Sequence, residues 1–196
     1  MIKALSIALS LAFATASIAQ TTHTVDTGAA KLMWTGKKVT GQHHGNIQVQ
    51  SGTIGWSANG LAEAEMVMDM TSITNLDLKP ESAENLIGHL KSKDFFNTVE
   101  FPTASFKATG VEKKNGVEAG MPNYTVTGEL TIKGITKPVT FDVLAWQEST
   151  GVRAAGTIVF DRTLYDIKYR SGQFFDALGD KMIDDLVELT FDLKAN

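Results

Sequence analysis

The chain of 196 residues contains no cysteine. This absence excludes thiol catalysis, disulfide cross-links and thiolate metal ligands, so the fold must be stabilised by burial of apolar side chains. The chain also lacks a long run of lysine or arginine, and its formal net charge is -4. Because a nucleic-acid-binding face needs a basic footprint, we expect no nucleic-acid partner.

Several catalytic and metal-binding motifs are also missing. There is no Gly-x-Ser-x-Gly nucleophile elbow and no Asp-x-Asp-x-Asp-Gly calcium loop, so the aspartates between Asp176 and Asp185 indicate a solvated acidic edge. The spacing of the histidines matches no zinc motif, and His43 and His44, as neighbours on a strand, are expected to point to opposite faces. The sequence therefore predicts no catalytic residue, no metal site and no cofactor.

Residues 1–19 have the features of a cleaved signal peptide. Lys3 supplies a positive charge, Ala4–Ile18 contains no charged residue, and Ser17–Ala19 is a small-x-small cleavage site. The apolar core is short for a membrane span, and no later stretch approaches the necessary length. We expect residues 20–196 to form a single periplasmic or secreted domain that is not an integral membrane protein, with a retained N-terminal anchor as the alternative.

Alternating apolar and polar residues predict a chain built mostly of strands. The clearest case is Tyr124–Lys133, followed by a turn over Gly134–Pro138 and a second strand from Val139, which together form a hairpin. One helix is predicted over Glu81–Ser92, after Pro80. The other predicted strands fall within Leu32–Val39, Ile47–Val49, Ile54–Trp56, Glu63–Met70, Pro102–Ala108, Ala154–Phe160 and Val187–Leu193, with a turn at Ser51-Gly52.

This pattern predicts an all-β protein, a closed antiparallel barrel of about eight strands with one or two short helices. Closure is favoured because it removes exposed sheet edges. Many residues on the predicted inner faces are small, including Gly128, Ala145, Ala64 and Ala104. A void lined by such residues costs stability unless something apolar fills it, so we expect an apolar central cavity.

Met66, Met68 and Met70 stand together on one face of a predicted strand. Methionine adapts its shape and suits a surface that accommodates varied apolar ligands, although ordinary core packing would give the same pattern. The apolar sides of the strands must share one interior. The predicted ligand-contacting residues are Trp34, Met66, Met68, Met70, Phe106, Val126, Leu130, Phe141, Ile158 and Phe160.

Several segments in order resemble the signatures of the YceI family. They are Val25-Asp26, Trp34–Lys38, Gly41–Gly45, His89–Phe96, Phe101–Phe106, Gly128–Pro138 and Phe160–Arg162. This resemblance covers nearly all of the chain after residue 19. It implies a lipocalin-like antiparallel barrel that holds a long isoprenoid or similar lipid chain in a periplasmic protein, often a homodimer. His44 and the segment Tyr165–Leu178 depart from the usual family pattern.

The non-strand inserts, the Glu81–Ser92 helix with Phe95-Phe96 and the segment Tyr165–Leu178, are expected to gate the mouth of the barrel. A polar head group should stay at that mouth, because burying it without partners is costly. For Arg162, a role in holding a loop beside Asp161 is the open alternative. The predicted head-group residues are Lys38, His43, Arg162, Tyr169 and Arg170.

Three functions remain open from the sequence. The first is a binding protein, not an enzyme, that sequesters or carries a long isoprenoid or similar amphiphile of polyprenyl or quinone type. The second is an enzyme acting on such a lipid or quinone, which would need clustered groups with shifted pKa values at the pocket. The third is an envelope stress or interaction protein with a vestigial cavity, which would need a packed interior or an exposed apolar patch.

Overall fold

The computed structural model describes residues 19–196, so the predicted signal peptide lies outside the described residues except for Ala19. The strands are β1 Gln20–Thr24, β2 Lys31–Lys38, β3 Gly41–Asn46, β4 Gln48–Ser57, β5 Gly60–Asp69, β6 Thr103–Lys113, β7 Tyr124–Ile132, β8 Ile135–Glu148, β9 Gly151–Asp161 and β10 Ile183–Ala195. Helix α1 spans Pro80–Lys91, and short 3₁₀ turns span Met70–Ser72, Arg162–Tyr165 and Gly179–Lys181. Within this part of the chain, no helix combines the length and apolar character that crossing a membrane requires.

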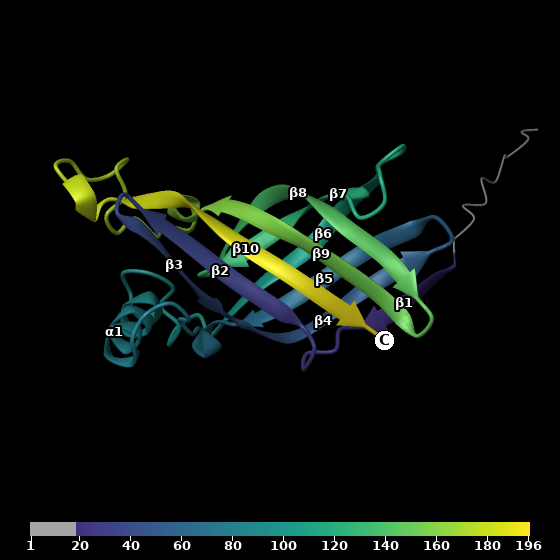
Figure 1. The fold of residues 1–196 in the computed structure, drawn as a ribbon, viewed down its shortest axis with the longest axis horizontal. Helices are drawn as coiled ribbons and strands as arrows, with labels where there is room; N and C mark the ends of the chain where they lie inside the picture. Colours follow the sequence, from purple (N-terminus) through teal and green to yellow (C-terminus); the bar gives the residue numbers. More distant parts are fainter. Residues whose placement is uncertain (1–18) are drawn as a thin grey trace, which may run out of the picture.

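The ten strands form one antiparallel sheet in the order β1-β4-β5-β6-β7-β8-β9-β10-β2-β3, which curls round on itself (Figure 1). The chain joins the two ends of the sheet, because β3 at one end continues into β4 near the other end after the single residue Ile47. The N–H of Ile47 donates to the carbonyl of Leu32 in β2 at 3.0 Å. At the other end of the seam, Val25 after β1 bridges to Ala195 of β10. The predicted lipocalin-like antiparallel barrel is confirmed, with ten strands in place of the expected number of about eight.

The central hairpin turns earlier than predicted. Lys133 and Gly134 alone connect β7 to β8, with φ angles of 52° and 71° that suit a two-residue hairpin turn. The predicted turn over Gly134–Pro138 is therefore wrong, and Pro138 lies inside β8. Proline is tolerated there because β8 pairs with β9 only from Val143 onward. Pro138 therefore has no hydrogen-bonded strand on that side of β8, as at the edge of a sheet.

The predicted turn at Ser51-Gly52 is also wrong, because β4 runs straight through it with a register shift between Val49 and Ser51. Gly52 is needed for close packing, since a Cβ there would lie 2.8 Å from the Glu65 carbonyl oxygen. A β-bulge and a turn favour the same residue types, so local sequence did not separate them. Strand β1 was not predicted, because Gln20–Thr24 is polar and shows no apolar alternation.

The predicted alternation does assign the inner faces of the strands correctly. Met66, Met68 and Met70 are only 2–4% exposed and belong to the same core cluster as Leu130 and Phe160. All ten predicted ligand-contacting residues are buried inside the barrel. The interior is therefore built by the strands, as their period of two requires.

Both inserts lie at one end of the barrel (Figure 1). The predicted helix is present, but α1 includes Pro80 as its first residue and ends at Lys91, one residue earlier at each end than predicted, and it buries Leu90. The second insert comprises residues 162–182, between β9 and β10, and is called the mouth segment below. The β6–β7 connection and the C-terminus lie toward the opposite end. We call the α1 end the mouth.

Candidate functional site

The barrel interior near the mouth contains a cavity of about 130 Å³, called the upper cavity. Strands supply most of its wall, and α1 with the residues after it covers one side. Its lining residues are Trp34, Gly36, Lys37, Lys38, His43, Ile47, Met68, Met70, Ile73, Leu86, Leu90, Phe95, Phe96, Ala104, Leu130, Ile132, Phe160, Arg162, Ile167, Ile183, Asp184, Val187 and Leu189.

A smaller lower cavity of about 40 Å³ lies toward the opposite end of the barrel. Its lining residues are Thr53, Ile54, Leu61, Ala64, Glu65, Met66, Phe106, Val126, Phe141, Val143, Ala154, Ile158, Phe191 and Leu193. The ten predicted contact residues divide equally between the cavities. Trp34, Met68, Met70, Leu130 and Phe160 line the upper one, and Met66, Phe106, Val126, Phe141 and Ile158 line the lower one.

The cavities are smaller than the small inner residues suggested. The space over Gly128 is filled by the ring of Phe106, and the space over Gly156 by the ring of Phe191. The expected empty volume at Gly128 is therefore wrong, because a large residue on the neighbouring strand occupies it, and the same holds at Gly156. An apolar cavity of roughly 150 Å³ accepts a molecule the size of benzene, so the upper cavity, at about 130 Å³, is of that scale.

The wall on the mouth side was only partly predicted. Leu86, Leu90, Phe95 and Phe96 come from the helix and the residues after it, and all four line the upper cavity. The i,i+4 spacing of the two leucines indicated an apolar helix face but not what that face covers. Ile167, fully buried, brings the mouth segment onto the same cavity.

His43 lies on the cavity wall and is held by a carboxylate. Its Nδ1 is 2.7 Å from Oδ2 of Asp77, in the loop that precedes α1. Burial alone would raise the pKa of Asp77, but hydrogen bonds from His43, from the His44 backbone and from Asn75 outweigh it and lower that pKa to about 2. Asp77 therefore fastens the loop to β3 as a carboxylate.

His43 and His44 were expected to point to opposite faces of the strand, but the loop before α1 brings Asp77 close to both rings. The His44 Nδ1 lies 3.7 Å from Oδ1 of Asp77, so both rings approach the same carboxylate. The loop can come this close because position 45 is glycine, where a Cβ would lie 1.8 Å from the carbonyl oxygen of Thr74. Within residues 19–196, no group of three or more His, Asp or Glu side chains is arranged to hold a metal ion.

Arg162 is 2% exposed and fully engaged by the protein. Its guanidinium donates to the carbonyls of Ile167, Tyr169, Ile183 and Asp184, and to Oδ1 of Asp185, at 2.7–3.1 Å. These five bonds use every N–H donor of an arginine side chain. The structure thus gives Arg162 the role of holding the mouth segment to β10, with Asp185 rather than Asp161 as its carboxylate partner, and leaves it no donor for a ligand.

Asp161, the other half of the Asp161-Arg162 pair, caps the 3₁₀ turn instead. Its Oδ1 accepts a hydrogen bond from the backbone N–H of Thr163 at 2.8 Å and one from the Thr163 hydroxyl at 2.7 Å. The alternative in which these two residues hold a loop therefore matches the structure, although each does so through its own hydrogen bonds. Asp161 therefore binds a residue two positions along the chain, whereas Arg162 binds Asp185 on β10.

Tyr169 joins the mouth segment to α1. Its ring centroid lies 4.5 Å from that of His89 and 5.6 Å from that of Phe95, and the Arg170 guanidinium stacks on it at 5.1 Å. Neither Tyr169 nor Arg170 lines the upper cavity. Of the five predicted head-group residues, only Lys38, His43 and Arg162 reach the cavity wall. Tyr169 instead contacts the other insert through His89 and Phe95, and Arg170 stacks on Tyr169.

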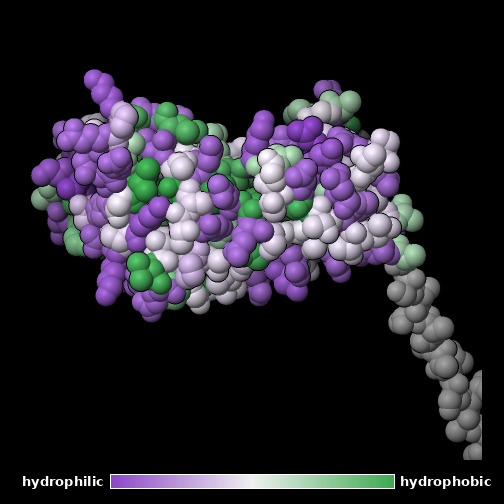
Figure 2. Space-filling view, turned by 90° about the horizontal axis from the view of Figure 1, so that it is seen from below, coloured by the Kyte–Doolittle hydropathy of each residue, from purple (hydrophilic) through white to green (hydrophobic). Residues whose placement is uncertain are grey.

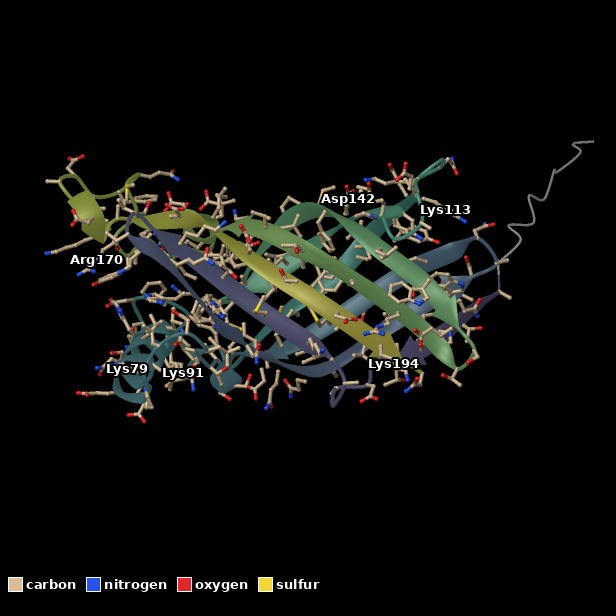
Figure 3. The ribbon with its side chains drawn as sticks, viewed as in Figure 1. Lys79, Lys91, Lys113, Asp142, Arg170 and Lys194 are labelled. Atoms are coloured by element: carbon tan, nitrogen blue, oxygen red, sulfur yellow. The ribbon has the colours of Figure 1, made fainter. Side chains whose placement is uncertain are left out.

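The outer surface near the mouth carries separate charged and apolar groups. Figure 3 places Arg170, Lys79 and Lys91 at this end of the molecule. Phe174 and Phe175 of the mouth segment are 49% and 51% exposed and do not line the upper cavity. On the face seen in Figure 2, hydrophobic side chains appear in small groups separated by hydrophilic ones. In the described part of the chain, no large continuous apolar patch is visible on this face.

Comparison with known proteins matches this architecture. The YceI-like domain matches residues 23–195. The UPF0312 protein of Photorhabdus laumondii is 49% identical over 51 residues, which cover 26% of this chain and 23% of that protein. Protein YceI of Escherichia coli O157:H7 is 48% identical over 54 residues, covering 28% of this chain and 25% of that protein. The matched segments thus span a quarter or less of these relatives.

Solved structures are similar over nearly the whole chain. Burkholderia cenocepacia BcnA has a TM-score of 0.67 at 24% identity, covering 88% of this chain and 99% of that one. A polyisoprenoid binding domain from Saccharophagus degradans has a TM-score of 0.59 at 16% identity, covering 92% and 99%. At these identities the likeness establishes the fold. The domain match over residues 23–195, the barrel and its apolar interior together place this chain in the YceI-like family.

Proposed function

We propose that this protein binds a long isoprenoid or similar amphiphile, of polyprenyl or quinone type, in the barrel interior and carries or sequesters it in the periplasm. The observation that carries this proposal is the wall of the upper cavity, where aliphatic, methionine and aromatic side chains are interrupted by charged or imidazole groups only at Lys37, Lys38, His43, Arg162 and Asp184. Such a wall selects for apolar chains, because an unpaired polar group would lose its hydration there.

Two further observations support the class of ligand and the location. The structurally similar domain from Saccharophagus degradans is described as polyisoprenoid binding. The sequence of residues 1–19 has the charge, apolar core and cleavage site of an export signal. A homodimer, implied by the family resemblance, stays a prediction.

The polar groups give the ligand a direction. Lys38 and His43 belong to the β2–β3 hairpin at the mouth, whereas the lower cavity is lined almost wholly by apolar residues. An amphiphile would enter tail first and keep its head beside these two donors, where water can still reach it. Arg162 would contribute indirectly, by holding the mouth segment in place.

A long chain needs more room than about 130 Å³, so binding would widen the cavity. Met68 and Met70 on its wall can change rotamer at little cost, and the two inserts meet through the rings of Tyr169 and His89. Opening that contact would move α1 and the mouth segment apart. We therefore propose that both inserts act as the gate.

Binding is favoured over catalysis by the arrangement of the polar groups. Of the residues lining the upper cavity, His43 is engaged by Asp77 and Arg162 by four carbonyls and Asp185. A general base or nucleophile has to be aimed at the reacting atom. We propose a protein that works as a carrier, without a cofactor.

The test is to purify the exported protein under gentle conditions and analyse it by native mass spectrometry before and after organic extraction. We expect an added mass that extraction removes and that is identified as a prenyl or quinone chain. Hydrogen exchange should show increased protection in α1 and residues 162–182 on loading with farnesol. A protein that carries no extractable chain and takes up no farnesol would contradict the proposal.

A further inference from the structure

Three phenylalanine rings cross the barrel interior below the upper cavity. Phe106 and Phe141 have ring centroids 5.3 Å apart, and Phe141 and Phe191 are 5.9 Å apart, with both pairs edge to face. The rings come from β6, β8 and β10, which are alternate strands. Inward residues of alternate strands stack in one layer of a barrel, so we call these three residues the phenylalanine layer.

The intervening strands provide glycine where the layer needs space. A Cβ on Gly128 of β7 would lie 2.5 Å from the ring of Phe106, and one on Gly156 of β9 would lie 2.9 Å from the ring of Phe191. Each outer ring therefore rests directly on the backbone of a neighbouring strand. Phe141 lies between them and contacts both, so the layer is braced from the two sides.

The phenylalanine layer lies at the boundary between the upper and lower cavities. On β6 the upper cavity is lined by Ala104, and the next inward residue, Phe106, lines only the lower cavity. On β10, likewise, Leu189 lines the upper cavity and the next inward residue, Phe191, lines the lower one. No described residue lines both cavities. A chain that enters at the mouth thus meets the phenylalanine layer before it reaches the lower cavity.

We propose that the phenylalanine layer sets the maximum length of the apolar chain that this protein accepts, an inference that rests on the proposed lipid binding. A tail that fits the upper cavity ends against the rings. A longer tail must displace rings that are backed by the glycine backbone, or leave its excess length in water. The ligand class is therefore a prenyl chain of limited length, with Phe141 as the central specificity-determining residue.

The experiment compares geraniol, farnesol and geranylgeraniol, each one isoprene unit longer than the last, on the full mature chain. Phe141→Ala removes the central ring and joins the two cavities. Leu193→Ala is the matched control, because Leu193 lines the lower cavity but is not part of the layer. Dissociation constants come from displacement of a fluorescent apolar probe, and Phe141→Leu provides a milder variant if the alanine variant does not fold.

We expect Phe141→Ala or Phe141→Leu to shift the preferred alcohol to a longer one, with affinity for geranylgeraniol relative to farnesol rising roughly tenfold in the alanine variant. Leu193→Ala should keep the wild-type order. If the folded variants bind all three alcohols in the wild-type order, the length limit is overturned while lipid binding stands. If neither wild type nor variant binds any of them, the proposed function itself fails.

Discussion

The two ends of the barrel are held together in different ways. At the mouth, polar contacts fix the inserts, as Arg162 does with its five bonds and Asp77 with its bonds to β3. At the opposite end, strands close directly on one another, as at the bridge from Val25 to Ala195, and the inner side chains pack with little space left. The comparison teaches that the upper cavity lies where hydrogen bonds and aromatic contacts, rather than paired strands, position the covering segments.

The largest effect is expected from removing Arg162. Arg162→Ala would leave four carbonyls and the Asp185 carboxylate without the buried guanidinium that binds them, and should lower the free energy of unfolding by about 3–5 kcal/mol. The matched control is Arg153→Ala, which removes an arginine bound to Asp192 on the solvent-facing side of the barrel and should change stability far less, because water screens that pair. Urea unfolding measures both. Equal losses would show that the mouth does not depend on its buried polar contacts.

The second effect concerns binding more than stability. Met68→Trp places a larger side chain on the wall of the upper cavity and should weaken farnesol binding roughly tenfold or more, with a stability change of about 1 kcal/mol. Val159→Trp is the control, since Val159 lies on the same barrel but is half exposed on its outer face. Unchanged farnesol occupancy in Met68→Trp would place the binding site elsewhere.

A smaller effect is expected at the rim. Replacing Lys38 and His43 together by alanine should weaken binding of farnesyl diphosphate about fivefold to tenfold and leave farnesol nearly unchanged, since exposed charge contacts are worth about 0.2–1 kcal/mol each. Arg170→Ala is the comparison, because Arg170 stacks on Tyr169 and does not line the cavity. Isothermal titration calorimetry measures the wild type and both variants. Equal losses for both ligands would argue against a head-group role.

The smallest effect is a dependence of stability on pH. The pKa of Asp77 is lowered from 3.8 to about 2 in the folded protein, so its contribution is fully present well above pH 4 and is lost as the pH falls toward 2. Asp77→Asn removes this titration. The difference in unfolding free energy between wild type and Asp77→Asn should therefore shrink between pH 5 and pH 2 on denaturant titration. A difference that stays constant over this range would rule out Asp77 as the pH-dependent fastener of the loop.

The strands and their inner faces could be predicted from the sequence because they follow from local periodicity. The alternation from Tyr124 to Ile132 and the methionine face of β5 each specify which side chains enter a shared interior. The two cavities could not be separated in this way. Met66 and Met68 share one face, but only the neighbouring strands place one in each cavity.

Features that the sequence by itself determined are those set within a few residues, namely the strand pattern, the start of α1 at Pro80 and the family signatures from Val25 to Arg162. Tertiary structure decided how residues far apart meet. Arg162 finds its partners Ile183 and Asp185 more than twenty residues along the chain, and Gly128 accepts a ring from the adjacent strand. The physical reason is that a polar group takes whichever partners the folded backbone brings within hydrogen-bonding distance, and a glycine leaves space that any neighbouring strand can fill.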